Sequence, residues 1–220
     1  MHSNRALRSN TPVSSSDARP APRGAGTNRL RIIAGAWRGR RIHFDDLPGL
    51  RPTPDRVRET LFNWLGQDLT TKRCLDLFAG SGALGFEALS RNALSVCFVE
   101  YSRHVAETIR RNARTLAADR WTLRCCDALE FLESAQAVHS DDHFDVVFLD
   151  PPFGANSLER VLPLLAERVA PGGVVYVESE AAFDFDARSE FQGWQVIKRA
   201  RAGAVHYGLI ESRQRTGEVS

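Results

Sequence analysis

The fold of this 220-residue chain is decided by the stretch Asp76-Leu77-Phe78-Ala79-Gly80-Ser81-Gly82-Ala83-Leu84-Gly85. It overlaps the end of an apolar run, residues 74–78, and leads into a helix-length segment, residues 84–91. Its three glycines have the spacing GxGxxG, which permits a tight turn and lets a ligand lie against bare backbone. A strand, a glycine turn and a helix in this order predict a nucleoside-binding βα unit.

Apolar runs and helix-length segments alternate regularly along the chain from this point. The runs typical of buried strands are residues 74–78, 95–100, 121–125, 144–149 and 173–178, followed by 194–198 and 204–210. The segments typical of helices are residues 84–91, 102–117, 128–137 and 157–169. Near-continuous hydrophobic strands that alternate with helices predict an α/β fold with a doubly wound, mostly parallel sheet.

Three acidic residues at strand ends indicate which nucleoside cofactor the crevice would take. Glu100 ends the second strand, 20 residues after Gly80, where an acidic side chain accepts from ribose hydroxyls. Asp76 faces the glycine turn, where it would repel a pyrophosphate but suits the ammonium of a methionine moiety. Asp127 either accepts from the adenine amino group or caps the next helix. These acids favour S-adenosylmethionine over NAD by roughly four to one.

Asp150-Pro151-Pro152-Phe153 follows the fourth strand and should border the same crevice, because doubly wound sheets bind ligands at the carboxyl ends of their strands. Asp150 and a backbone carbonyl of the Pro-Pro segment can accept the two N–H groups of an aromatic amine, which aims its lone pair at a methyl donor. Proline fixes φ and so positions that carbonyl in advance. Phe153 offers a stacking surface for a base. The alternative interpretation is an ordinary Asp-Pro turn.

The part of the chain before the glycine stretch predicts a hairpin and a helix. Residues 30–34 and 41–44 read as two short strands. Thr53 is expected to cap a helix that has Pro54 at its first position. The apolar residues at helical spacing on one face of this helix are Val57, Leu61, Trp64 and Leu65.

Charge is distributed unevenly along the chain. Residues 1–60 contain 12 basic and 5 acidic residues, a balance of +7, and the remaining 17 basic and 22 acidic residues give −5. A basic front end indicates a polyanionic partner, or else a solvated tail that binds nothing. Arginines of the hairpin suit phosphate contacts, and those near the helix would hold a flipped nucleotide or form surface ion pairs. The predicted RNA-contact residues are Arg31, Arg38, Arg40, Arg41, Arg51, Thr53, Arg56 and Arg58.

Composition indicates the cellular compartment and whether a metal site is expected. No stretch is apolar enough for a membrane helix, and the N-terminus lacks the apolar region of a secretory signal. Three of the four cysteines lie in strand-like runs as small buried hydrophobes, which favours a reducing, cytoplasmic location. His139 and His143 have a metal-binding spacing, but they lie in a polar connector and we expect no metal.

Several motifs resemble those of a known family. Residues 76–82 together with Asp150–Phe153 resemble class I amino-methyltransferases with a DPPF-type motif. Residues 51–63, RPTPDRVRETLFN, are similar to the N-terminal signature of the bacterial family that methylates guanine N2 at one site in 16S ribosomal RNA, and so are residues 31–39, RIIAGAWRG, and 202–207, AGAVHY. The match spans residues 30 to 211.

The resemblance implies a Rossmann-like, seven-stranded sheet with its last strand antiparallel, S-adenosylmethionine as methyl donor with S-adenosylhomocysteine as product, and a small-subunit assembly as substrate. It implies a catalytic role for Asp150, Pro151, Pro152 and Phe153. The predicted cofactor-binding residues are Asp76, Phe78, Ala79, Gly80, Ser81, Gly82, Glu100, Tyr101, Asp127 and Ala128.

These observations predict a division of the chain and a ranking of functions. We expect a disordered basic tail over residues 1–28, a hairpin extension over 29–50, a methyltransferase domain over 51–213 and a short tail over 214–220, in a monomer. Guanine-N2 methylation of 16S ribosomal RNA is the leading hypothesis. Adenine-N6 methylation of DNA or RNA uses the same chemistry, and the alternatives of other classes are an NAD-dependent oxidoreductase and a non-catalytic RNA-binding module.

Overall fold

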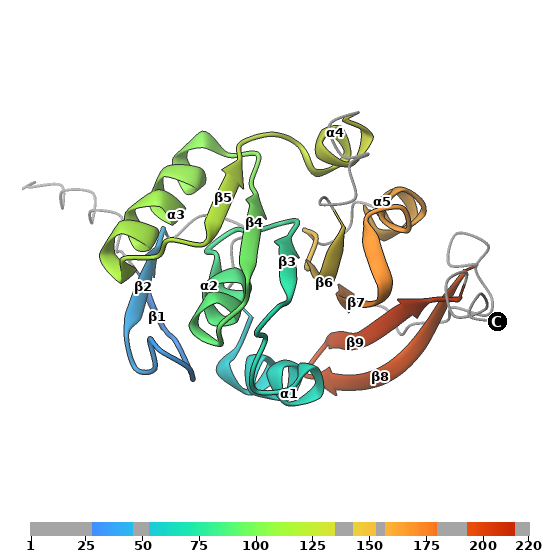
Figure 1. Cartoon of the computed structure of the whole chain (residues 1–220), viewed down its shortest axis with the longest axis horizontal. Coiled ribbons are helices and arrows are strands. Elements are labelled where there is room, and N and C mark those ends of the chain that lie inside the picture. The colour runs from blue at the N-terminus through green and yellow to red at the C-terminus, as the bar shows by residue number, and fades with distance from the viewer. Residues whose placement is uncertain (1–27, 46–52, 135–142, 153–156, 180–192, 214–220) are drawn as a thin grey trace, which may run out of the picture.

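A computed structural model describes residues 28–45, 53–134, 143–152, 157–179 and 193–213 of the chain (Figure 1). The elements follow one another as β1 (Asn28–Arg31), β2 (Arg41–Phe44), α1 (Asp55–Leu65), β3 (Arg73–Asp76), α2 (Ala83–Ser90), β4 (Ser95–Val99), α3 (Arg103–Leu116), β5 (Trp121–Arg124), α4 (Ala128–Glu133), β6 (Phe144–Leu149), α5 (Ser157–Leu165), β7 (Val169–Ser179), β8 (Trp194–Ala202) and β9 (Val205–Ser212). Residues 1–27 and 214–220, together with Arg51, Phe153 and His139, lie outside the described residues, and Asn28, the last residue of the predicted N-terminal tail, begins β1.

The main sheet has seven strands in the order β5-β4-β3-β6-β7-β9-β8. Strands β5, β4, β3, β6 and β7 pair in parallel, whereas β9 is antiparallel to both of its neighbours. The predicted doubly wound sheet with an antiparallel last strand is therefore confirmed. Because the strand order reverses direction at β3 and β6, the crevice of this sheet opens where those two strands end.

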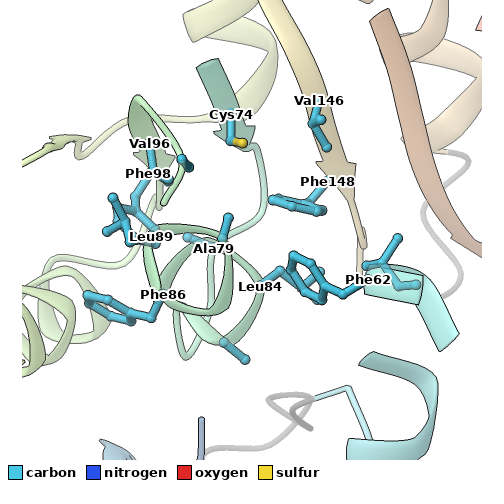
Figure 2. Close-up of a cluster of buried hydrophobic side chains, with 14 of the residues drawn as sticks. Phe62, Cys74, Ala79, Leu84, Phe86, Leu89, Val96, Phe98, Val146 and Phe148 are labelled. Atoms are coloured by element: carbon cyan, nitrogen blue, oxygen red, sulfur yellow. The ribbon is translucent and has the colours of Figure 1, made fainter. Parts of the chain in front are cut away.

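Each face of the sheet is covered by its own hydrophobic cluster. One cluster joins α1, α2, α3 and the hairpin to strand residues such as Cys74 and Phe148, and Figure 2 shows Phe62 and Phe86 packed there. The other joins α4 and α5 to Leu75 and its neighbours. Successive residues of a strand point to opposite faces. Asp76 therefore lies on the Cys74 side of the sheet, which is the side of α1 and α2.

The hairpin is docked on the domain and does not project from it. Strands β1 and β2 pair antiparallel, and Ile32 and Ile42 are buried in the core. The hairpin lies beside α3 (Figure 1). The His43 N–H donates to Asn112 Oδ1 of this helix, and Asn112 Nδ2 donates to the His43 carbonyl oxygen. A Cβ atom at Gly35, whose φ is +79°, would lie 1.8 Å from the Ser90 carbonyl oxygen. Only glycine permits this approach to α2.

The boundaries of two N-terminal elements differ from the prediction. Strand β1 ends at Arg31 and does not continue to residue 34, because the Ile33 and Ala34 N–H groups donate to the Glu87 carboxylate. Helix α1 has Pro54 as its N-cap residue and no side-chain cap hydrogen bond. The predicted cap at Thr53 is wrong, since its hydroxyl donates to Asp150 Oδ2 at 3.5 Å.

The segment between α5 and β7 also differs from the prediction. Helix α5 ends at Leu165, four residues short of the expected boundary, and β7 begins at Val169. Val169 pairs with Phe144, and the register then shifts before Val146 pairs with Val174. The strand therefore begins four residues before the predicted run, 173–178, and includes Pro171 and Gly172, which apolar periodicity does not assign to a strand.

Candidate active site

The glycine turn requires its glycines. Gly80 has a φ of +50° and Gly82 a φ of +75°, both in the left-handed region. A Cβ atom at Gly82 would lie 2.8 Å from the Phe86 ring, and one at Gly85 would lie 2.2 Å from the Phe98 ring. The sequence therefore makes a turn that leaves its backbone open and places the first turn of α2 directly against β4.

Asp76 is a buried carboxyl that holds the start of α2. Its Oδ2 accepts from the Gly85 N–H at 3.0 Å. Burial, and to a smaller extent the negative charge of Glu100, raise the pKa of Asp76 to about 7. A carboxyl whose charge is this poorly compensated favours a cation beside it.

Glu100 connects the glycine turn to the end of β4. Its Oε2 accepts from the Gly80 N–H at 3.0 Å, and its Oε1 accepts from the Ser102 N–H at 2.8 Å. Burial raises the pKa of Glu100. The next residue, Tyr101, is 79% exposed, so an aromatic ring stands in solvent beside this carboxyl.

Asp127 has the helix-capping arrangement that the sequence left open. Its Oδ1 accepts from the Leu129 N–H at 2.8 Å and from the Glu130 N–H at 3.4 Å at the start of α4. The side chain is exposed and Ala128 is buried. A cap does not prevent a second contact, because each carboxylate oxygen has two lone pairs.

The Asp150 turn lies beside the glycine turn. Asp76 pairs with Phe148 in the register of β3 with β6, and the Leu77 N–H donates to the Phe148 carbonyl oxygen at 3.1 Å. The two turns therefore leave adjacent parallel strands at their carboxyl ends. Burial raises the pKa of Asp150 well above its ordinary value, and the negative charges of Glu178 and Asp76 add to this effect. Pro151 is buried and Pro152 is exposed.

Two residues of this site, Tyr176 and Glu178, were not predicted from the sequence, and Thr53 was predicted only as a helix cap and an RNA contact. Thr53 donates to Asp150, and the Tyr176 hydroxyl donates to Glu178 Oε1 at 2.7 Å. A sequence signal for Glu178 did exist, because this acidic residue ends a predicted buried strand at the same edge of the sheet as Asp150. No local pattern indicated the contact of Thr53 with Asp150, because the two residues are 97 positions apart in the sequence.

The predicted RNA-contact residues fall into different environments. Arg38, Arg41 and Arg56 are exposed, and their side chains make no hydrogen bond or ion pair within the described part of the chain. Arg31 is exposed and pairs with Asp55 at 3.5 Å. Arg40 is also exposed but donates to the Thr115 and Leu116 carbonyl oxygens at the end of α3.

Arg58 and Thr53 are not at the surface. Arg58 is 0% exposed and contacts Glu87 at 3.4 Å, Asp55 at 2.6 Å and the Arg31 carbonyl oxygen at 3.0 Å. Thr53 is 4% exposed. The predicted RNA contacts of these two side chains are therefore wrong: Arg58 compensates buried charge and Thr53 contacts Asp150.

A family model described as Conserved hypothetical protein 95 matches residues 30–211. The chain belongs to this family. Its relatives include Ribosomal RNA small subunit methyltransferase D of Haemophilus influenzae, 43% identical over 83% of this chain and 94% of the relative, and the Escherichia coli protein of the same name, 41% identical over 90% and 96%. It is a class I methyltransferase with a Rossmann-like fold.

Solved structures agree with the fold. A putative methyltransferase from Escherichia coli matches with a TM-score of 0.69 at 39% identity, over 84% of this chain and 98% of that one. A putative methylase from Haemophilus influenzae has the same TM-score at 40% identity, over 84% and 99%.

Three further predictions concern membrane helices, a metal site and the burial of the cysteines. No helix in the described ranges combines the length and the apolar character needed to cross a membrane. Within the same ranges, no three His, Cys, Asp or Glu side chains group in a way that could hold a metal ion. All four cysteines are free, but Cys125 is exposed, so the prediction that it serves as a buried hydrophobe is wrong.

Proposed function

We propose that this chain transfers a methyl group from S-adenosylmethionine to the exocyclic N2 amine of a guanine in 16S ribosomal RNA of the small subunit. The observation that carries the proposal is the adjacency of two turns, because Asp76 and Asp150 leave neighbouring parallel strands on one face of the sheet. The names of the bacterial relatives support ribosomal RNA as the substrate class.

The residues around the glycine turn fit a cationic nucleoside cofactor. The Asp76 carboxyl is buried and Asp150 is half-buried, and no basic side chain in the described part of the chain is paired with either. S-adenosylmethionine, when bound, supplies an activated methyl group on a sulfonium cation. We assign its ammonium to Asp76, its ribose hydroxyls to Glu100 and its adenine to Tyr101, Asp127 and Ala128. The remaining predicted contacts are Phe78, Ala79, Gly80, Ser81 and Gly82.

Asp150 and the Pro-Pro segment would orient the target amine. An aromatic amine is a weak nucleophile because its lone pair is delocalised into the ring. When Asp150 accepts one N–H and a carbonyl of Pro151 or Pro152 accepts the other, the nitrogen becomes more tetrahedral and its lone pair points to the methyl group. Fixed acceptors of this kind stabilise the positive charge that develops on nitrogen. Phe153 would stack on the base.

Exposed arginines of the hairpin and of α1 would hold RNA phosphates. Arg38 and Arg41 are the favoured contacts because their side chains lack partners among the described residues, and Arg31 and Arg56 lie nearer the site. Arg40 is the least favoured of the exposed set, since it is bound to α3. In this proposal the enzyme acts as a cytoplasmic monomer on naked RNA or on an assembled small subunit.

The test is radiolabelled methyl transfer onto small subunits that lack methylation, followed by mapping of the labelled nucleotide. Label on guanine N2 is expected, and label on adenine N6 would replace the proposed specificity. Asp150→Ala should abolish transfer while calorimetry still detects S-adenosylmethionine binding. Asp119→Ala, in which an 84% exposed side chain is removed, is the matched control. Retained turnover in Asp150→Ala, or tight binding of NAD, would overturn the proposal.

The RNA surface is tested separately by the salt dependence of binding. Charge reversal of Arg38 and Arg41 to Glu should lower affinity and reduce the slope of log K against log salt by about 1 for each phosphate that the protein no longer neutralises. Charge reversal of Arg199 and Arg201 provides the control, because these exposed residues lie on β8 at the opposite edge of the sheet. An equal change in both pairs would exclude the hairpin as the phosphate-binding surface.

A further inference from the structure

Two carboxyl groups lie side by side where β6 and β7 end. Leu149 pairs with Val177 in the parallel register of these strands, so the residues that follow, Asp150 and Glu178, are neighbours. Adjacent strands lie about 4.8 Å apart. Because side chains alternate between the two faces of a sheet, both acids lie on the face of Tyr176. The two carboxyls therefore point to the same side, about one strand spacing apart.

Two tyrosines surround the Glu178 carboxyl. The Tyr176 hydroxyl donates to Glu178 Oε1 at 2.7 Å. Tyr207 lies opposite Glu178 in the antiparallel register of β7 with β9, and the two tyrosine rings are 6.3 Å apart. Glu178 is 6% exposed. A carboxyl fixed among aromatic rings is a rigid acceptor, and a ligand atom that faced it without donating a hydrogen would bind poorly.

Both acids keep acceptor capacity for a ligand. A carboxylate has about four lone-pair sites, and the Tyr176 hydroxyl uses one of those on Glu178. Burial and the charge of Glu178 raise the pKa of Asp150 well above its ordinary value, whereas the hydrogen bond from Tyr176 opposes the rise in the pKa of Glu178. A proton held by this pair therefore resides on Asp150, whose carbonyl oxygen still accepts, and Glu178 acts as an acceptor.

The Watson–Crick edge of guanine matches two neighbouring acceptors. In guanine the exocyclic N2 amine stands beside N1–H, so two donors point the same way. In adenine and cytosine the ring nitrogen beside the exocyclic amine carries a lone pair and no hydrogen. Enzymes that act on a flipped base read this edge by hydrogen bonds. A second acceptor beside Asp150 therefore favours guanine and disfavours the other two amino bases.

We propose that Glu178 determines specificity for guanine, because its carboxyl accepts the N1–H of the target base while Asp150 accepts from the N2 amine. The inference rests on the proposed function and accounts for guanine N2, rather than adenine N6, as the methylated amine. Tyr176 contributes by holding Glu178 Oε1 in place. Two parallel hydrogen bonds from one base also fix the plane of the ring, which keeps the amine aligned with the methyl donor.

Base analogues at the target nucleotide test this contact in the parent enzyme. Small subunits are reconstituted with RNA that carries guanine, 2-aminopurine or 7-deazaguanine there. 2-Aminopurine keeps the N2 amine but has a bare N1, so its kcat/KM should be about 100-fold or more below that of guanine. 7-Deazaguanine keeps both donors and should stay within about threefold of guanine. Equal turnover of guanine and 2-aminopurine would overturn the proposal, whether or not any variant of Glu178 folds.

The Glu178→Gln variant isolates the contact with N1. 2-Aminopurine also lacks O6, but that loss is the same for parent and variant. The glutamine amide can donate to a bare N1 and can still accept from Tyr176. The ratio of kcat/KM for guanine to that for 2-aminopurine should therefore fall about 10- to 100-fold.

The matched control is Glu167→Gln, which makes the same change at an exposed position just before β7, at the other end of that strand. Its ratio should equal that of the parent. If Glu178 only supports the fold, its substitution lowers both rates together and leaves the ratio unchanged, and this result would contradict the proposal.

Failure of the proposed function would give a different result. A parent enzyme that transfers no methyl group to guanine N2, or that labels adenine, rejects the proposed function itself. Transfer to guanine N2 without discrimination against 2-aminopurine rejects only the role of Glu178.

Discussion

The Glu87 carboxylate and the carboxyls of Asp76, Asp150 and Glu178 lie on the same side of the sheet, and these two sets differ in what compensates their charge. Glu87 contacts two buried guanidinium groups, Arg58 at 3.4 Å and Arg91 at 2.9 Å, and also accepts from two backbone N–H groups. The group of Asp76, Asp150 and Glu178 has only hydroxyl and backbone donors within the described residues. Glu87 joins elements of the fold, whereas the three carboxyls of the second set lie at the edge where strands end, with no cation beside them among the described residues.

This difference distinguishes a carboxylate that stabilises the fold from carboxylates that are available to bind a ligand. A buried carboxylate whose charge and hydrogen bonds are already satisfied by protein groups has little tendency to bind a ligand. Buried acids without a cation retain raised pKa values and favour positive charge beside them, as Asp76 and Asp150 show. Functional sites are enriched in groups of the second kind.

The largest expected effect comes from breaking the compensated group. Arg58→Met should lower the free energy of unfolding by about 3 kcal/mol, because Glu87 is left buried with one ion pair fewer. The melting temperature should fall by roughly 6–12 °C at this chain length. Arg56→Met changes an exposed arginine on the same helix and should stay within about 0.5 kcal/mol. Similar results for both variants in urea unfolding would contradict the assignment of Arg58.

An intermediate effect is expected from the uncompensated group when pH is varied without ligand. The pKa of Asp76 is raised from 3.8 to about 7 in the folded chain. Between these values the folded state holds a proton that the unfolded state has released, so stability falls as pH rises. Asp76→Asn should remove about 2 kcal/mol of this decline between pH 5 and 7. Asp119→Asn is the control, and parallel curves for parent and Asp76→Asn would refute the prediction.

The smallest effect belongs to a charged group that is neither buried nor functional. Glu107 on α3 pairs with Arg110 at 3.5 Å and Arg114 at 2.7 Å, and all three side chains are at least 41% exposed. Glu107→Gln should change the free energy of unfolding by less than about 0.5 kcal/mol, since solvent and salt screen exposed pairs. A decrease comparable to that of Arg58→Met would mean that exposure does not distinguish the two kinds of pair.

The sequence predicted the elements that depend on local pattern. Apolar runs located the parallel strands, and the strand β6 was predicted with its observed bounds, Phe144–Leu149. The glycine spacing and Asp150 marked the two turns that the fold brings to one edge. Both are encoded by neighbouring residues, so periodicity and turn chemistry are sufficient to find them.

Contacts between distant segments could not be read in this way. Thr53 looked like a helix cap because the residues after it form a helix, yet its hydroxyl is used by Asp150. Arg58 looked like a surface residue on an amphipathic helix, and its partner Glu87 is 29 positions away. Charged residues on a helix are ambiguous until the helix opposite is known, because burial of an arginine depends on whether a carboxylate faces it.

The Glu87 carboxylate attaches the hairpin to α2, and this attachment affects how readily the hairpin opens. It accepts the amide protons of Ile33 and Ala34 and lies in α2, the helix that begins at the glycine turn. We expect those two amides to exchange with deuterium only when the hairpin separates from this helix. That separation is costly, because it removes two hydrogen bonds from the buried Glu87 carboxylate. Slow exchange of these two amides is therefore expected to report how firmly the hairpin is attached to α2, the helix that follows the glycine turn.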